Sequence, residues 1–299
     1  MEQKQFNKGD YIFHKNDFED VFYKVLSGSV GIEDDFGEED GRLAEIGEGQ
    51  FFGEMGVIDG YPRSADAVAL EDGTTVEVFS LNDLHGYFEE SPDHILEIMK
   101  ALGDRLRSLT AEYEEARKIA DDLNVDGLDS NELFEKKLKK YSYYAKQAQG
   151  KLDKPKKSEE VKREDHTKGF HKNVITYKKG SVIVREGDMV NCMYDIQWGR
   201  VGIYKNYGTP EEQQLAILAS NEFFGEIGMI SKEPRSATAV ALDQNTTIET
   251  IYPQDFEELF EKDPVKVDMI LRHLTDRVRK LSRRYTDLCN EISKKSGNA

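Results

Sequence analysis

The stretch FFGEMGVIDGYPRSADAVAL, residues 51–70, occurs a second time as FFGEIGMISKEPRSATAVAL, residues 223–242. Fourteen of the twenty aligned positions are identical, at an offset of 172 residues. The same offset continues downstream, where DRLRSL at 104–109 corresponds to DRVRKL at 276–281, and it becomes 171 upstream. Self-similarity of this kind predicts two copies of one domain. The change of offset predicts a single-residue length difference, which we expect in a hairpin loop.

Length and composition agree with two globular domains. A chain of 299 residues suits two domains, because single domains commonly have ~100 to 150 residues. The formal charge of −17 counts against nucleic-acid binding, since such binders neutralise phosphates with Lys and Arg. No apolar run approaches the ~20 residues needed to span a bilayer, and the first residues do not resemble a signal peptide. We therefore expect a soluble, cytoplasmic protein.

Catalytic and metal-binding patterns are not evident in the sequence. The two cysteines, Cys192 and Cys289, are too few for a disulfide framework and lack metal-ligand spacing. The six histidines do not show the His and Asp clustering that a metal-dependent phosphodiesterase needs. We expect no enzymatic activity, no bound metal and no cofactor.

Each repeat reads as a β domain followed by a helix. Short runs of β-branched and aromatic residues, at 21–26, 42–46 and 75–79, are separated by Gly, Asp and Asn. After Pro92, and again after Pro264, apolar residues recur at helical spacing. The sequence therefore predicts an α+β protein of two small antiparallel, jelly-roll-like β-barrels, each followed by a long amphipathic helix.

The expected domains are residues 1–118 and 173–299, with a linker at 119–172 between them. The linker is predicted to be helical at 130–149 and basic beyond it. Residues 136–172 contain thirteen Lys and Arg but only five Asp and Glu. A run of this kind is ordinarily a solvated surface, and the alternative is docking onto an acidic surface.

The run F-G-E, followed after seven residues by P-R-S-A, resembles the phosphate-binding cassette of the cyclic-nucleotide-binding domain family. We call residues 52–65 the first cassette and 224–237 the second. The resemblance implies that Gly53 and Glu54 begin a short helix whose free N–H groups face a cyclic phosphate. It also implies that Arg63 clamps the phosphate oxygens and that Glu54 accepts the ribose 2′-hydroxyl.

The resemblance implies the same roles in both cassettes. The ligand-binding set is Phe52, Gly53, Glu54, Met55, Gly56, Arg63, Ser64 and Ala65 in the first cassette, and Phe224, Gly225, Glu226, Ile227, Gly228, Arg235, Ser236 and Ala237 in the second. The serines are expected to face the ligand, and the alanines to leave room for the phosphate. The alternative for a single copy is a buried Glu–Arg pair that only holds a loop, and two complete copies favour binding.

The cassettes depart from the family pattern in small ways. Gly56 and Gly228 stand where the family often has Ala, which predicts a looser cassette helix. Asn16 stands where the second repeat has Gly187, and because Asn tolerates a positive φ, we expect the turn to be kept.

A residue of the helix after the barrel commonly caps the base in this family. Tyr113 and Tyr285 are the candidate lids because an aromatic ring can stack on a purine. The alternative is that each tyrosine only packs against its barrel.

The function implied is a receptor that binds two cyclic nucleotides per chain, cyclic AMP in preference to cyclic GMP, and signals to a protein partner by rearranging its helices and linker. One alternative is a regulatory subunit of a separate enzyme such as a kinase, and another is a transcription regulator that acts without a DNA-binding domain of its own. Residues 286–299 are expected to be too few for the helix-turn-helix of bacterial relatives, and those before Phe6 too few for the N-terminal segments of kinase regulatory subunits.

Overall fold

The described residues of the chain form two compact units. The computed structural model describes residues 2–33, 42–91, 93–123, 138, 141 and 172–296. Of these, the first unit contains residues 2–33, 42–86, 104–123, 138, 141 and 275–296, and the second contains 87–91, 93–103 and 172–274. The domain boundaries expected at 118 and 172 stay a prediction.

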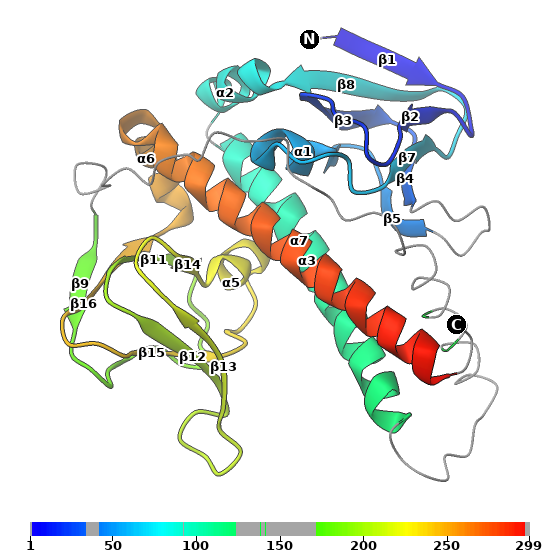
Figure 1. Cartoon of the computed structure of the whole chain (residues 1–299). Helices are drawn as coiled ribbons and strands as arrows, with labels where there is room; N and C mark the ends of the chain where they lie inside the picture. The colour runs from blue at the N-terminus through cyan, green and yellow to red at the C-terminus, as the bar shows by residue number, and fades with distance from the viewer. Residues whose placement is uncertain are drawn as a thin grey trace. The chain divides into compact units, whose positions relative to one another are not determined.

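The first unit contains two four-stranded antiparallel sheets in its described part (Figure 1). One sheet has the order β1-β8-β3-β6 and the other β2-β7-β4-β5. The strands are β1 (Glu2–Phe6), β2 (Tyr11–Phe13), β3 (Val21–Ser27), β4 (Val30–Glu33), β5 (Arg42–Ile46), β6 (Phe51–Phe52), β7 (Asp66–Ala69) and β8 (Thr74–Ser80). The predicted strands at 21–26, 42–46 and 75–79 are therefore confirmed as β3, β5 and β8.

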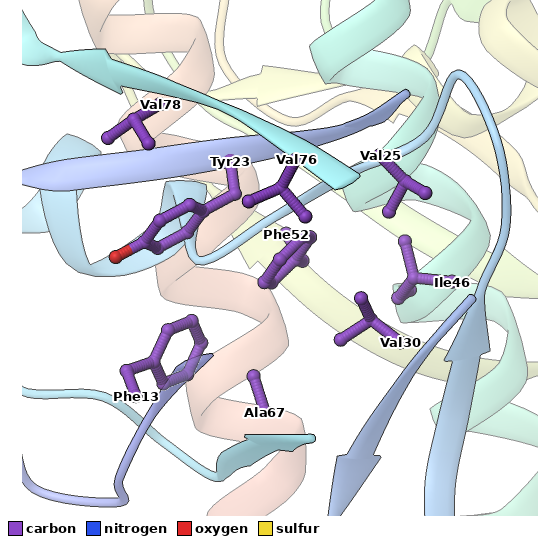
Figure 2. Close-up of a cluster of buried hydrophobic side chains, with 9 residues drawn as sticks. All are labelled: Phe13, Tyr23, Val25, Val30, Ile46, Phe52, Ala67, Val76 and Val78. Atoms are coloured by element: carbon purple, nitrogen blue, oxygen red, sulfur yellow. The ribbon is translucent and has the colours of Figure 1, made fainter. Parts of the chain in front are cut away.

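The core of the first unit lies between its two sheets. Figure 2 shows side chains from both sheets directed toward one another. One sheet supplies Tyr23, Val25, Phe52, Val76 and Val78, and the other supplies Phe13, Val30, Ile46 and Ala67. Two antiparallel sheets that bury their facing side chains make a jelly-roll-like sandwich, as the sequence predicts.

The second unit repeats this arrangement in the part of the chain that is described. Its sheets have the orders β14-β11-β16-β9 and β10-β15-β12-β13. The strands are β9 (Val174–Tyr177), β10 (Val182–Val184), β11 (Met193–Trp198), β12 (Val201–Lys205), β13 (Gln213–Leu218), β14 (Phe223–Phe224), β15 (Thr238–Ala241) and β16 (Thr246–Ile251). Tyr194, Ile196 and Ile248 are among the buried residues of its core.

The single-residue length difference lies in one hairpin of each unit. Val30 pairs with Ile46 between β4 and β5, and Val201 pairs with Leu218 between β12 and β13. The first residues of these pairs differ by the offset 171 and the second by 172. The change of offset therefore falls in this hairpin, as predicted.

Short and long helices follow the strands. The short helices are α1 (Glu54–Asp59), α5 (Glu226–Ser231), α2 (Leu81–Glu90), the 3-10 helix η1 (Pro253–Asp255) and α6 (Phe256–Lys262). The long helices α3 (Asp93–Asp122) and α7 (Pro264–Lys295) confirm the predicted amphipathic helices. The predicted linker helix at 130–149, apart from Leu138 and Tyr141, and the basic run, apart from those two and Lys172, lie outside the described residues.

Candidate functional site

The short helix of each cassette is preceded by a glycine whose backbone conformation other residues adopt only with strain. Gly53 and Gly225 precede α1 and α5 with φ of 76° and 80°, a left-handed conformation that side chains disfavour. A Cβ on Gly53 would lie 2.7 Å from Nη1 of Arg63. The glycine therefore allows the arginine side chain to pass directly beneath the backbone at the start of the helix.

Arg63 is held in a fixed orientation under α1. Its guanidinium donates to the carbonyl oxygens of Gly53 and Val21, both at 2.5 Å, and lies 3.0 Å from Oε2 of Glu19. The guanidinium carbon also sits 4.3 Å from the centre of the Phe13 ring. Although the residue is only 3% exposed, its Nε has no hydrogen-bond acceptor among the described residues.

Tyr23 stays neutral beside this arginine. Burial raises the pKa of the Tyr23 hydroxyl to about 12; the negative charge of Glu19 adds to the rise and the charge of Arg63 opposes it. The hydroxyl donates to Oε2 of Glu19 at 3.2 Å. The raised pKa keeps the Tyr23 hydroxyl protonated near neutral pH.

Arg235 occupies the same place in the second unit, with one difference. It is 5% exposed, donates to the carbonyl oxygens of Gly225 and Cys192, and lies 5.4 Å from the centre of the Tyr194 ring. Val190 stands where the first repeat has Glu19. The second cassette therefore lacks the counterpart of the carboxylate that partly neutralises Arg63.

A turn outside the cassettes fixes the backbone of both arginines. Asn16 and Gly187 have φ of 70° and 86°, so the turn is kept as predicted. The amide of each residue donates to the carbonyl of the cassette arginine, at 2.9 and 2.8 Å. This shared contact explains why the turn needs a positive φ in both repeats.

Glu54 is a buried carboxylate with incomplete hydrogen bonding. It is 1% exposed, and its Oε1 lies 3.1 Å from Nη1 of Arg105 on α3. Within the described residues, neither carboxylate oxygen accepts a well-aligned hydrogen bond. Because a buried acceptor without a donor is costly, this site suits a ligand that brings a hydroxyl. Glu226 is equally buried in the second unit.

A hollow in the first unit gathers six of the eight residues predicted in the first cassette. The predicted residues that line it are Gly53, Met55, Gly56, Arg63, Ser64 and Ala65. Phe13, Ile32, Arg105 and Arg279 complete its walls. The sequence analysis did not predict Arg105 as a site residue, although the repeat places it in register with Arg277. No sequence motif indicates that Arg279 of α7 lines the site.

The remaining cassette residues divide between core and surface. Phe52 and Phe224 are buried in the sandwich cores, where they stack on Tyr23 and Tyr194 at 5.1 and 4.8 Å between ring centres. Ser64 and Ser236 are exposed, Ala65 is buried, and Ile227 and Ala237 are half-buried. The two phenylalanines thus attach the cassettes to the sandwich cores.

Gly56 and Gly228 have a packing reason that the sequence alone did not reveal. A Cβ on Gly56 would lie 3.1 Å from the carbonyl oxygen of Tyr61, and one on Gly228 would lie 3.0 Å from Nη1 of Arg235. Both distances are tighter than ordinary contacts. The glycines give room to the loop and the arginine that follow.

The two candidate lids lie in a cluster of helical residues. Tyr285 is 7% exposed, its ring is nearly perpendicular to that of Tyr141, and its hydroxyl lies 3.4 Å from Oε2 of Glu112. Tyr113 is half-buried against the same cluster, which includes Ala116. Their role as lids stays a prediction.

Metal-binding clusters and membrane-spanning helices are absent from the described residues. No group of three or more His, Cys, Asp or Glu could hold a metal ion there. Within the same residues, no helix combines the length and apolarity needed to cross a membrane.

Both repeats match the family profile described as the cyclic nucleotide-binding domain, at residues 3–91 and 174–263. These matches cover more than half of the chain. The chain therefore belongs to the cyclic nucleotide-binding domain family.

Similar proteins include regulatory subunits of cAMP-dependent protein kinase. The Candida albicans subunit is 25% identical over 283 residues, which is 89% of this chain and 47% of the relative. The Dictyostelium discoideum subunit is 25% identical over 253 residues, 83% of this chain and 62% of the relative. The chain therefore spans about half or somewhat more of these proteins. A solved structure of the Toxoplasma gondii PKA regulatory domain with cAMP aligns with 94% of this chain and 85% of its own, at 16% identity and a TM-score of 0.28.

Proposed function

We propose that this protein is a receptor that binds one cyclic nucleotide in each cassette and has no catalytic activity of its own. The observation that carries the proposal is the burial of one glutamate and one arginine in the first cassette, Glu54 and Arg63, and its repetition in the second cassette. A loop that needed only an internal ion pair would place these two side chains against each other. In the first cassette, Glu54 instead pairs with Arg105 and Arg63 with backbone carbonyls.

The ligand chemistry follows from these two groups. A phosphate is a stronger acceptor for a guanidinium than a neutral carbonyl is, because both partners are charged. The unsatisfied Glu54 carboxylate suits the donor hydroxyl of a ribose. A small molecule that carries a phosphate anion and a ribose hydroxyl a few ångströms apart, as a cyclic nucleotide does, offers one partner to each group.

We propose cyclic AMP as the preferred ligand, with a cyclic-GMP-selective receptor as the alternative. Ser64 and Ser236 are exposed and could each offer one hydroxyl to a guanine amino group. A single optional hydrogen bond contributes about 0.5 to 1.5 kcal/mol, which is at most about tenfold in affinity. The relatives named as cAMP-dependent kinase subunits support the choice of cyclic AMP.

Calorimetry of the full chain against cyclic AMP and cyclic GMP tests the receptor and its selectivity together. We expect two equivalents of cyclic AMP, and a cyclic GMP affinity that is lower at both sites. A hydrogen bond from a serine to the guanine would change this difference by at most about tenfold. No detectable heat with either nucleotide would remove the proposal, and tighter binding of cyclic GMP at both sites would reverse the selectivity.

A second candidate function is the regulatory subunit of a separate kinase. It is favoured by matches that cover 89% and 83% of this chain to proteins of that name. We expect such a subunit to inhibit a purified cAMP-dependent protein kinase catalytic subunit and to release it when cyclic AMP is added. A kinase activity that the chain leaves unchanged at micromolar concentration would favour a stand-alone receptor with another protein partner.

A further inference from the structure

Helix α7 makes a buried ion pair with the first cassette. Nη2 of Arg279 lies 2.9 Å from Oδ1 of Asp59, and its Nε contacts the other carboxylate oxygen. The two side chains are only 8% and 10% exposed. The guanidinium carbon also lies 4.7 Å from the centre of the Tyr61 ring. A bidentate pair that is buried and stacked fixes the orientation of both side chains.

This contact borders the hollow of the candidate site. Asp59 is the last residue of α1, and Arg279 lines the hollow together with Arg63 and Ser64. The hollow has a volume of about 30 Å³ on a measure in which one water molecule needs about 10 to 15 Å³. This is room for a few water molecules, so the side chains around the hollow must move apart to admit a cyclic nucleotide.

The two repeats differ in sequence at the positions of this ion pair. Ser231 and Glu233 stand where the first cassette has Asp59 and Tyr61, so α5 carries no carboxylate at the position of Asp59. Arg107, the counterpart of Arg279, pairs with Asp104 one turn earlier on its own helix. The two residues that form this contact are therefore not both kept in the second repeat.

An apolar contact anchors the same segment of α7 further along the helix. Tyr285, Cys289 and Ile292 are buried in one cluster with Ala116 and Ile119 of α3. The last five turns of α7 are thus attached at two places in the first unit, one apolar and one ionic. The ionic attachment is the one that touches the cassette.

We propose that Arg279 and Asp59 form a latch, which holds the C-terminal half of α7 against the first cassette and opposes ligand binding there. The proposal rests on the receptor function proposed above. Ligand and latch compete because the phosphate needs space around Arg63 that the latched helix restricts. By thermodynamic reciprocity, the latch lowers the affinity of the ligand by the same factor as the ligand weakens the latch. Binding at the first site therefore releases the end of α7.

The test uses Asp59→Asn and Arg279→Gln, singly and together, in the full chain with Arg235→Ala to weaken the second site. We expect either variant to raise the affinity of the first site for cyclic AMP, by about 5- to 150-fold if the coupling is of ordinary size. The double variant should gain no more than either single one, since both remove the same contact. Lys280 directly follows Arg279 on α7 and makes an exposed ion pair with Asp276. Lys280→Gln should therefore leave the affinity of the first site for cyclic AMP unchanged.

A second measurement does not depend on nucleotide binding. Hydrogen exchange over residues 275–295 of the nucleotide-free protein should become faster in Asp59→Asn than in the unmodified chain, while exchange in β3 stays unchanged and reports an intact fold. Unchanged exchange in α7 would overturn the latch. Weaker cyclic AMP binding by Arg279→Gln would also overturn it and make Arg279 a ligand contact. If the unmodified chain binds no nucleotide, the receptor function fails, whereas the exchange experiment still decides whether the latch exists.

Discussion

Replacing Lys266 by methionine is expected to lower the free energy of unfolding of the second unit by about 3 to 5 kcal/mol. Nζ of Lys266 lies 2.6 Å from Oε2 of Glu249 and 2.9 Å from Oδ2 of Asp195. All three residues are at most 3% exposed. Without the ammonium group, two buried carboxylates lose the cation that pairs with both of them, which is costlier than the loss of an exposed pair.

The pH dependence of this effect has a definite sign. Burial by itself lowers the pKa of Lys266, but the charges and hydrogen bonds of Asp195 and Glu249 outweigh it, so the net pKa is raised. The contribution of the charged lysine to stability is therefore fully present below its ordinary pKa of about 10.4 and is lost as the pH rises through the higher folded value. Between pH 5 and pH 8 the lysine is charged in both the folded and the unfolded chain, so its contribution, and with it the loss of stability in Lys266→Met, should be the same at both values.

Urea unfolding at pH 8 and at pH 5 measures both effects. The single tryptophan, Trp198, lies in β11 and reports on the second unit. Lys262→Met is the matched control, because Lys262 makes an exposed pair with Glu258 on α6 and such pairs contribute about 0 to 1 kcal/mol. Equal losses in the two variants, or a loss in Lys266→Met that differs between the two pH values, would contradict this account of the network.

Comparison of the two repeats in sequence does not predict this network of Lys266, Asp195 and Glu249. The first repeat has Lys24, Glu77 and His94 where the second has Asp195, Glu249 and Lys266. Lys24 lies opposite Glu77 in the register of β3 and β8, so the lysine is on a strand in one repeat and on a helix in the other. Alignment of the repeats identifies equivalent positions, but it does not show how charges are redistributed among them.

The sandwich of each unit could be predicted, whereas the partners of the long helices could not. Strand runs such as 75–79 and the Pro-initiated helix at 264 follow from local patterns. An apolar helix face predicts that the face is buried, but it does not identify the segment that packs against it. Residues 87–103 belong to the compact unit of the second repeat, and 275–296 to that of the first. Periodicity has no information on which of two similar domains a helix covers.

The cassette residues were predicted by the motif, and the groups that hold them were not. Gly53 and Arg63 come together as the motif implies. Glu19 and Arg105, which pair with Arg63 and Glu54, lie 44 and 51 residues away in sequence. Long-range partners of this kind leave no local pattern, and in the second repeat a valine replaces Glu19.

The substitutions Arg63→Ala and Arg235→Ala are expected to abolish one nucleotide site each. Losing a desolvated, charged contact to phosphate should cost about 2 to 5 kcal/mol, a factor of about 30 or more in affinity. Calorimetry with cyclic AMP should therefore give one strong site in each single variant and none in the double variant. Arg63 also donates to the carbonyls of Gly53 and Val21, so Arg63→Lys, which keeps the charge but loses the planar fork, is measured beside Arg63→Ala.

Arg200→Ala is the control for loss of an arginine from the second unit, because Arg200 pairs with Asp243 at the surface and is 56% exposed. It should bind two equivalents with unchanged affinity. Arg63→Lys should weaken the first site less than Arg63→Ala does, since a lysine still offers a point charge to the phosphate. If Arg63→Ala and Arg235→Ala each kept two equivalents at the affinity of the unmodified chain, with both units still folded by circular dichroism, the buried arginines would only support the loop and the ligand would bind elsewhere.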